Sequence, residues 1–204
     1  MFQDAARIAF GKGVRCVAVP EVRVLEVKRS IRTNKIGKVD SLLVHVKDDK
    51  AIDFAALKVQ AVYISGHSIH PAFDKYLKTN VLDESATRRP DFRSSAQKRL
   101  MPQLGLKVPI FRRWGKRFFV AVDSTFFKEL PVMQGQSPGN SEVTWLVYDF
   151  ERQREGGYAM QPPIVAHTTW DGVQQAMREG RAPEKQELLE QLTTDARNYK
   201  AFTT

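Results

Sequence analysis

Polar residues interrupt two apolar segments of the sequence, and their spacing could serve phosphodiester chemistry. Asp40 opens the segment VDSLLVHVK at 39–47, and Lys58 and Gln60 lie in the middle of FAALKVQAVYIS at 54–65. Side chains alternate along a strand, so Lys58 and Gln60 share one face. An aspartate on one strand beside two polar side chains on the next can hold a divalent cation and an attacked phosphate. The same spacing also fits an edge strand with one face in water.

The elements that must position these residues follow from hydrophobic periodicity and from glycine and proline signals. We expect a hairpin loop at 29–38 and a turn at 48–50. We expect helices at 2–10, 71–80, 91–106, 125–130, 169–179 and 184–198. We expect strands at 21–29, 39–47, 54–65, 118–124 and 143–150, with an edge strand within 151–166.

The helix expected at 91–106 has a predicted orientation. Ser94 and Ser95 should face outward, Pro102 should shorten or distort the helix, and the leucines should face inward, namely Leu100, Leu104 and Leu106.

The order of strands, helices and further strands predicts an α/β fold, bordering on α+β, with a mixed central β-sheet flanked by helices. We expect a single domain over residues 1–204, with a core at about 14–166 and C-terminal helices at about 169–198.

The charge of the chain favours a polyanionic partner, with nucleic acid first. Lys and Arg number 32 against 23 Asp and Glu, which gives a net charge of +9 and a pI near 9.7. Basic residues concentrate in 85–117, where Asp91 is the single acid. This segment is either a solvated basic face or a surface that contacts phosphates. Its candidates for DNA contact are Arg88, Arg89, Arg93, Lys98 and Arg99.

The single cysteine and the hydropathy exclude several classes of protein. Cys16 leaves no intrachain disulfide and no cysteine metal cluster, and its apolar neighbours in VRCVAVP predict a small core residue. No apolar run is long enough to span a bilayer, and residues 1–20 lack the hydrophobic region of a signal peptide. We therefore expect a cytoplasmic protein with no membrane partner.

Several motifs in order resemble the NotI family of restriction endonucleases. They are PEVRV at 20–24, VD at 39–40, DFAALKVQAVYISG at 53–66, RPDF at 89–92, SSAQKRLMPQL at 94–104 and VAVDSTFF at 120–127. The resemblance implies a PD-(D/E)xK nuclease core and hydrolysis of double-stranded DNA with Mg²⁺ by a homodimer. It also implies sequence-specific cleavage, with a cognate DNA methyltransferase as a candidate partner.

The resemblance also assigns site residues where the motifs match. Glu21 corresponds to the outer carboxylate and Asp40 to the central metal-binding aspartate, so both are predicted Mg²⁺ ligands. Gln60 corresponds to the glutamine that stands where related nucleases carry the catalytic lysine. Position 58 departs, because the family pattern has glutamate there and this chain has Lys58. The predicted catalytic set is therefore Glu21, Asp40, Lys58 and Gln60.

Lys58 brings an ammonium to the place expected for the cation, where like charges repel and the lysine would pair with Asp40 or Glu21. Three interpretations follow: an inactivated nuclease that still binds DNA, a rearranged site in which Lys58 stabilises phosphate charge, or one Mg²⁺ held by Glu21 and Asp40. The rival to an enzyme is a non-catalytic DNA-binding module that keeps the nuclease fold. Asp123 is interpreted as a helix N-cap rather than a catalytic acid.

Overall fold

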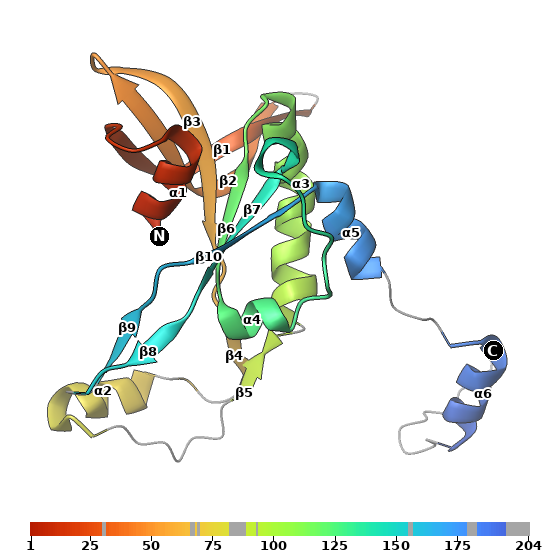
Figure 1. The fold of residues 1–204 in the computed structure, drawn as a ribbon. Helices are drawn as coiled ribbons and strands as arrows, with labels where there is room; N and C mark the ends of the chain where they lie inside the picture. Colours follow the sequence, from red (N-terminus) through yellow and green to blue (C-terminus); the bar gives the residue numbers. More distant parts are fainter. Residues whose placement is uncertain are drawn as a thin grey trace.

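A six-stranded mixed β-sheet forms the centre of the protein (Figure 1). The computed structural model describes residues 1–29, 32–65, 68, 70–81, 89–92, 94–154, 157–178 and 183–194. The sheet has the order β1-β2-β3-β6-β7-β10, in which β3, β6 and β7 are parallel and the other neighbours are antiparallel. Its strands are β1 (Cys16–Arg29), β2 (Arg32–Lys47), β3 (Lys50–Val59), β6 (Phe118–Asp123), β7 (Val143–Tyr148) and β10 (Ile164–Thr168).

Two short antiparallel pairs accompany the sheet, β4 (Tyr63–Ser65) with β5 (Arg89–Asp91) and β8 (Phe150–Arg152) with β9 (Tyr158–Met160). The helical segments are α1 (Phe2–Phe10), α2 (His70–Thr79), η1 (Ser94–Leu100), α3 (Met101–Arg113), α4 (Ser124–Lys128), η2 (Pro138–Asn140), α5 (Trp170–Arg178) and α6 (Lys185–Thr194).

Helices cover both faces of the central sheet, with α1 on one side and α3 on the other (Figure 1). Under α1, Ala5 packs on Leu57 and Leu146 in an apolar cluster. On the other face, α3, α4 and α5 enclose a larger core that includes Phe111 and Trp145. This arrangement confirms the predicted mixed sheet flanked by helices. Among the described residues, no helix is both long and apolar enough to cross a membrane.

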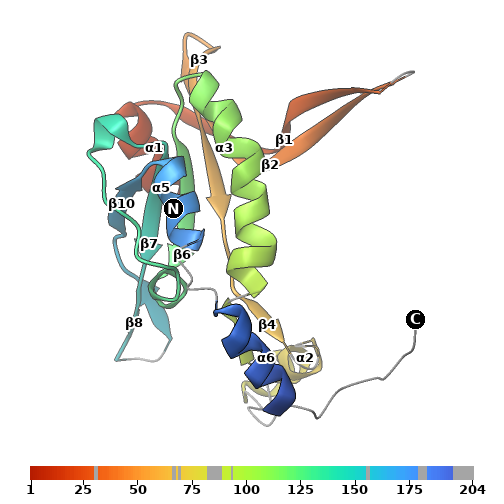
Figure 2. The ribbon, with the colours of Figure 1, turned by 90° about the vertical axis from the view of Figure 1, so that its right-hand side faces the viewer.

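The β1–β2 hairpin is longer than the sequence predicted. β1 begins at Cys16 rather than at residue 21, and the segment 29–38, predicted as a loop, is β-strand from Arg32 onward. β2 pairs with β3 only from Ser41 to Lys47, so the remainder forms a two-stranded ribbon that projects from the body (Figure 2). The segment from Arg32 to Lys38 is rich in polar residues and becomes strand through its backbone pairing with β1, which hydrophobic periodicity does not report.

The predicted helix 91–106 is also different in the structure. β5 ends at Asp91, and a π-helix, η1, runs directly into the α-helix α3. Pro102 occupies the first turn of α3, where a missing backbone N–H costs least. The proline thus marks the start of a helix that extends to Arg113.

The π-helical turn changes which residues face the core. Ser95 is fully buried, against its predicted outward orientation, and Leu106 is exposed, against its predicted inward orientation. A π-helix has a wider turn than an α-helix, so a periodicity of 3.6 residues carried through the segment assigns faces wrongly. Leu100 and Leu104 do face the core, as predicted.

Other predicted elements agree with the structure to within about two residues at most ends. The N-terminal helix is the same in sequence and structure, and α2, β6, α4, β7, α5 and the start of α6 lie close to their predicted positions. The third strand differs, because the predicted segment 54–65 divides into β3, which ends at Val59, and β4, which begins at Tyr63.

Candidate active site

Lys58 lies near the end of β3, a central strand of the sheet, and Gln60 follows directly after that strand. β3 is hydrogen-bonded to β2 on one side and to β6 on the other. Lys58 is 6% exposed and Gln60 is 7% exposed. The interpretation of an edge strand with one face in water is therefore wrong. Two buried polar side chains at the end of a central strand require polar partners, because unpaired burial is costly.

Asp40 is the partner of Lys58. The last β2–β3 pair joins Ser41 to Leu57, which places Asp40 beside Lys58 on the neighbouring strand. The Nζ atom of Lys58 lies 3.2 Å from Oδ2 of Asp40 and donates a hydrogen bond to it. The lysine side chain is 7% exposed and the aspartate side chain 40%. The site therefore has one buried side and one side open to solvent.

Glu21 stands across from Asp40 but is bound to a different lysine. The pairs Pro20–Ser41 and Val22–Val39 place Glu21 opposite Asp40 in the β1–β2 register. Its Oε1 accepts a hydrogen bond of 2.7 Å from Nζ of Lys38, and both side chains are more than half exposed. That hydrogen bond and the lysine charge hold the pKa of Glu21 below its ordinary value.

The backbone of Glu21 has a φ of 59°. Such a left-handed conformation is unfavourable for a residue other than glycine and is concentrated at functional sites. It lies at the point where the ribbon leaves the sheet. The strain thus coincides with the predicted carboxylates.

Gln60 is fixed by backbone contacts. Its backbone N–H donates to the carbonyl of Ala121 at 2.9 Å, and its Nε2 donates to the carbonyl of Ala61 at 2.7 Å. The amide group thus bonds the chain just beyond β3, and not Lys58 or Asp40.

Lys107 of α3 completes the site and was not predicted as a site residue. It is 4% exposed, and its Nζ donates to Oε1 of Gln103 at 3.2 Å. Burial lowers the pKa of Lys107; the charge of Asp40 opposes this shift, whereas the charges of Lys58 and Lys38 add to it. α3 packs against β2, and its Leu104 lies in one buried cluster with Val39 and Ala56, which are close in sequence to Asp40 and Lys58. Lys107 therefore lies on the face of α3 that covers this part of β2 and β3.

A sequence signal for Lys107 does exist. Leu104, Val108 and Phe111 are buried at helical spacing, and Lys107 lies on the same face. A charged residue on the apolar face of a helix indicates a buried polar site. The shorter helix predicted for this segment ended before that face was complete.

The predicted DNA contacts fall into two groups. Arg89 lies in β5, and Lys98 and Arg99 lie in η1, where all three are exposed. Arg88 and Arg93 lie outside the described residues. Two further cations of the basic segment form ion pairs within the fold: Arg112 bonds Glu142 at 2.8 Å, and Lys116 pairs with Asp53.

Asp123 is a helix cap, as predicted. Its Oδ1 accepts a hydrogen bond of 2.8 Å from the backbone N–H of Phe126 at the start of α4. This satisfies a donor of the first helical turn and leaves Asp123 with a structural role.

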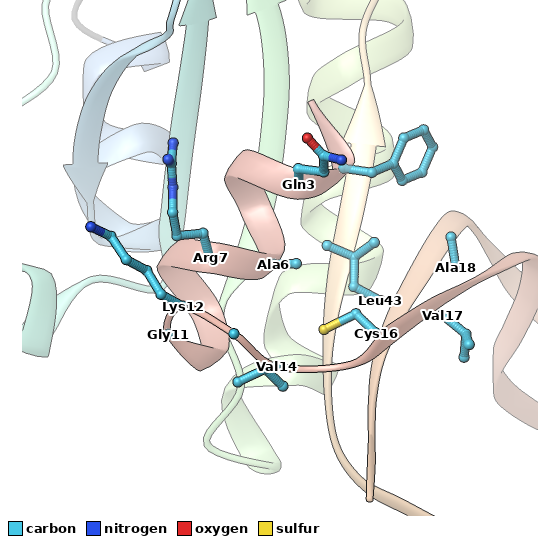
Figure 3. Close-up of a pocket in the computed structure, with 12 residues that line it drawn as sticks. Gln3, Ala6, Arg7, Gly11, Lys12, Val14, Cys16, Val17, Ala18 and Leu43 are labelled. Atoms are coloured by element: carbon cyan, nitrogen blue, oxygen red, sulfur yellow. The ribbon is translucent and has the colours of Figure 1, made fainter. Parts of the chain in front are cut away.

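A separate pocket of about 450 Å³ lies between α1 and the β1–β2 strands (Figure 3). Cys16 lines it and is half-buried, so it is not the core residue that the sequence predicted. Burial raises the pKa of the Cys16 thiol, which favours the protonated and less reactive form. Arg7 and Lys12 also line the pocket. The pocket contains none of the predicted site residues.

The fold and the site together define a mixed α/β protein with a charged cluster where its sheet branches into a ribbon. A family model described as restriction endonuclease NotI matches residues 1–160, and the chain belongs to the NotI restriction endonuclease family. Restriction endonucleases act on DNA. Neither the curated proteins nor the solved structures contain a match to the chain.

Proposed function

We propose that this protein binds double-stranded DNA as a restriction endonuclease whose cleavage is impaired by Lys58. The observation that carries the proposal is the 3.2 Å ion pair between the buried Lys58 and Asp40. Asp40 is the predicted central Mg²⁺ ligand, and here its carboxylate already neutralises an ammonium. A cation at the same carboxylate would be repelled by that ammonium.

The carboxylates as arranged do not fit a Mg²⁺ ion. Mg²⁺ requires oxygen ligands in octahedral geometry, and proteins usually supply one or two carboxylates. Glu21 and Asp40 are each bonded to a lysine. Among the described residues, no group of three or more His, Cys, Asp or Glu side chains could hold a metal ion. We therefore assign no catalytic step through Mg²⁺ in this arrangement.

The DNA would lie along the exposed cations of β5 and η1, with the Asp40 side of the site facing it. Phosphate contacts position the duplex and base contacts specify the sequence. The proposed assembly is a homodimer on a PD-(D/E)xK core in which each subunit addresses one strand. The family membership and the basic balance of the chain support this proposal.

A second candidate is an active endonuclease. It is favoured by the β1–β2 register, which places Glu21 opposite Asp40. Because the Glu21–Lys38 pair is exposed, it is weakly held and could exchange for a different partner. In this candidate, Glu21 and Asp40 are the carboxylates that would bind Mg²⁺.

A plasmid cleavage assay in Mg²⁺ separates the candidates when the chain is compared with its Lys58→Glu variant. We expect the variant to cleave at least tenfold faster, because the substitution removes the ammonium and adds a carboxylate. The triple change Lys58→Glu, Asp40→Ala, Glu21→Ala is the inactive control. Equal cleavage by the chain and by Lys58→Glu would support the active endonuclease instead.

A further inference from the structure

We propose that Lys58 and Lys107 form an anion site that holds a DNA backbone phosphate without a divalent cation. This inference rests on the proposed function, because DNA supplies the phosphate. It adds Lys107 as a ligand-binding residue and changes the chemical class that the site accepts from cation to anion.

The first observation is the environment of Lys107. The residue is 4% exposed and lies on the face of α3 that contributes Leu104 and Val108 to the core. Its Nζ donates to a neutral amide oxygen of Gln103. Among the described residues, no carboxylate lies within ion-pair distance of Lys107. A buried ammonium with a neutral partner is costly, and a bound anion would offset that cost.

The second observation is the balance of charge around Asp40. Lys58 is bonded to Asp40, and Lys107 is influenced by the charges of Asp40, Lys58 and Lys38. The charge of Lys38 is neutralised by its ion pair with Glu21. Leu104, one turn before Lys107, packs with Val39 and Ala56 beside the Lys58–Asp40 pair. This part of the core therefore holds two buried ammonium groups and one carboxylate, Asp40, so the excess charge is positive. A phosphodiester carries one negative charge and is the matching ligand.

The third observation is that the site has donors left for an anion and a side open to solvent. An ammonium has three N–H donors, and Asp40 accepts from Lys58 while Gln103 accepts from Lys107. Asp40 keeps 40% of its side chain exposed, so solvent reaches the cluster from that side. Lys98 and Arg99 precede Lys107 by about two helical turns and are exposed.

The decisive measurement is duplex DNA binding in EDTA by the chain and its Lys107→Met variant. Methionine keeps the length and apolar character of the lysine stem, so the fold should persist. We expect about tenfold weaker binding by the variant, and a salt dependence whose slope falls by about 0.9, as for one lost phosphate contact. Lys128→Met, which removes an exposed lysine of α4, is the matched control and should bind as the parent chain does.

Inorganic phosphate provides a second readout that is independent of DNA. In EDTA, sodium phosphate should raise the unfolding temperature of the chain above that in sodium chloride of equal ionic strength. Lys107→Met and Lys58→Met should both lose this increase, and Lys128→Met should keep it. Using two variants preserves the test if one of them folds poorly.

The outcomes separate this inference from the function on which it rests. If the chain binds duplex DNA and Lys107→Met binds it with unchanged affinity and salt dependence, the anion site is wrong and the proposed function stands. The anion site would also be wrong if Mg²⁺ increased the DNA affinity of the parent chain as much as it increased that of Lys58→Glu. If the chain binds no duplex DNA with or without Mg²⁺, the proposed function itself fails.

Discussion

The two faces of the central sheet use burial in different ways. Under α1, the sheet presents an apolar surface that includes Leu57, Phe119 and Leu146. Under α3, the same sheet buries Lys58, and the helix adds Lys107. Leu57 and Lys58 are neighbours on β3 and are both buried, yet one is hydrophobic and the other charged. The comparison indicates that burial on the α1 face stabilises the fold, whereas burial of charged groups on the α3 face lowers stability and forms a charged site.

The strongest test of this comparison replaces the two neighbours in turn. Leu57→Ala should lower the free energy of unfolding by about 3 kcal/mol, because it removes buried methyl groups and leaves a cavity. Lys58→Met should change it by less than about 1 kcal/mol in either direction, since an apolar residue can replace a buried charge without loss. Urea denaturation measures both values. Equal losses would mean that the two faces contribute alike.

A smaller effect is expected from Asp40→Ala, which leaves Lys58 buried without its carboxylate. Removing one partner of a fully buried pair costs about 3–5 kcal/mol. Because Asp40 is partly exposed, we expect a loss of about 2 kcal/mol. The double variant Asp40→Ala, Lys58→Met should recover most of this loss in the same urea experiment. Failure of the second change to restore stability would show that the ion pair does not account for the loss.

The polar contact at the margin of the α1 face should contribute less. The hydroxyl of Tyr148 donates to Oδ2 of Asp4 at 2.8 Å. Burial opposes ionisation of Asp4, but this hydrogen bond, the N-terminal ammonium and Arg7 together hold its pKa below the ordinary value. Tyr148→Phe should therefore cost about 1 kcal/mol at neutral pH.

The pH dependence of that loss has a definite sign. The folded pKa of Asp4 lies below the unfolded pKa of about 3.9, so its contribution is complete above that value and disappears as the pH falls through the folded pKa. The difference in stability between the chain and Tyr148→Phe should thus shrink as the pH falls below about 4. A difference that grows in acid would contradict this assignment.

The smallest effect is expected at the exposed partner of the site. The Glu21–Lys38 pair is open to solvent on both sides, and such pairs contribute little because water and salt screen them. Glu21→Ala should leave the urea midpoint unchanged in 1 M salt, roughly the regime in which surface charges are fully screened. A clear loss of stability at that salt concentration would show that Glu21 contributes to the fold as Asp40 does, and not as an exposed surface charge.

Much of the fold could be predicted because the hydrophobic pattern of many segments matches their burial in the folded protein. The apolar runs that become β6 and β7 are buried throughout, and their strand assignment needed no tertiary information. The β1–β2 hairpin was predicted but its length was not, because the polar segment from Arg32 to Lys38 becomes strand only through its pairing with β1. The orientation of Ser95 depended on a π-helical turn, and its composition gave no sign of that turn.

The candidate site was predictable in type more than in arrangement. Lys58 and Gln60 were conspicuous as polar residues in an apolar strand, and Asp40 followed from the adjacent motif. Charge alone allowed Lys58 to pair with either Asp40 or Glu21, and the structure shows the pair with Asp40. Lys107 required knowledge that α3 packs over β2 and β3, a contact between segments far apart in the sequence. Sequence reasoning therefore found the strand residues and missed the residue from the helix.

β2 leaves the central sheet at the candidate site and continues into the ribbon. One half of β2 is anchored between β1 and β3, and the other half extends into the projecting ribbon (Figure 2). Asp40 lies at the junction, immediately before the last residue paired with β3. Asp40 thus belongs to both parts of β2, because it lies across from Glu21 in the hairpin and bonds Lys58 of the sheet. Any change in the pairing at the base of the ribbon would therefore act directly on the carboxylate that holds Lys58.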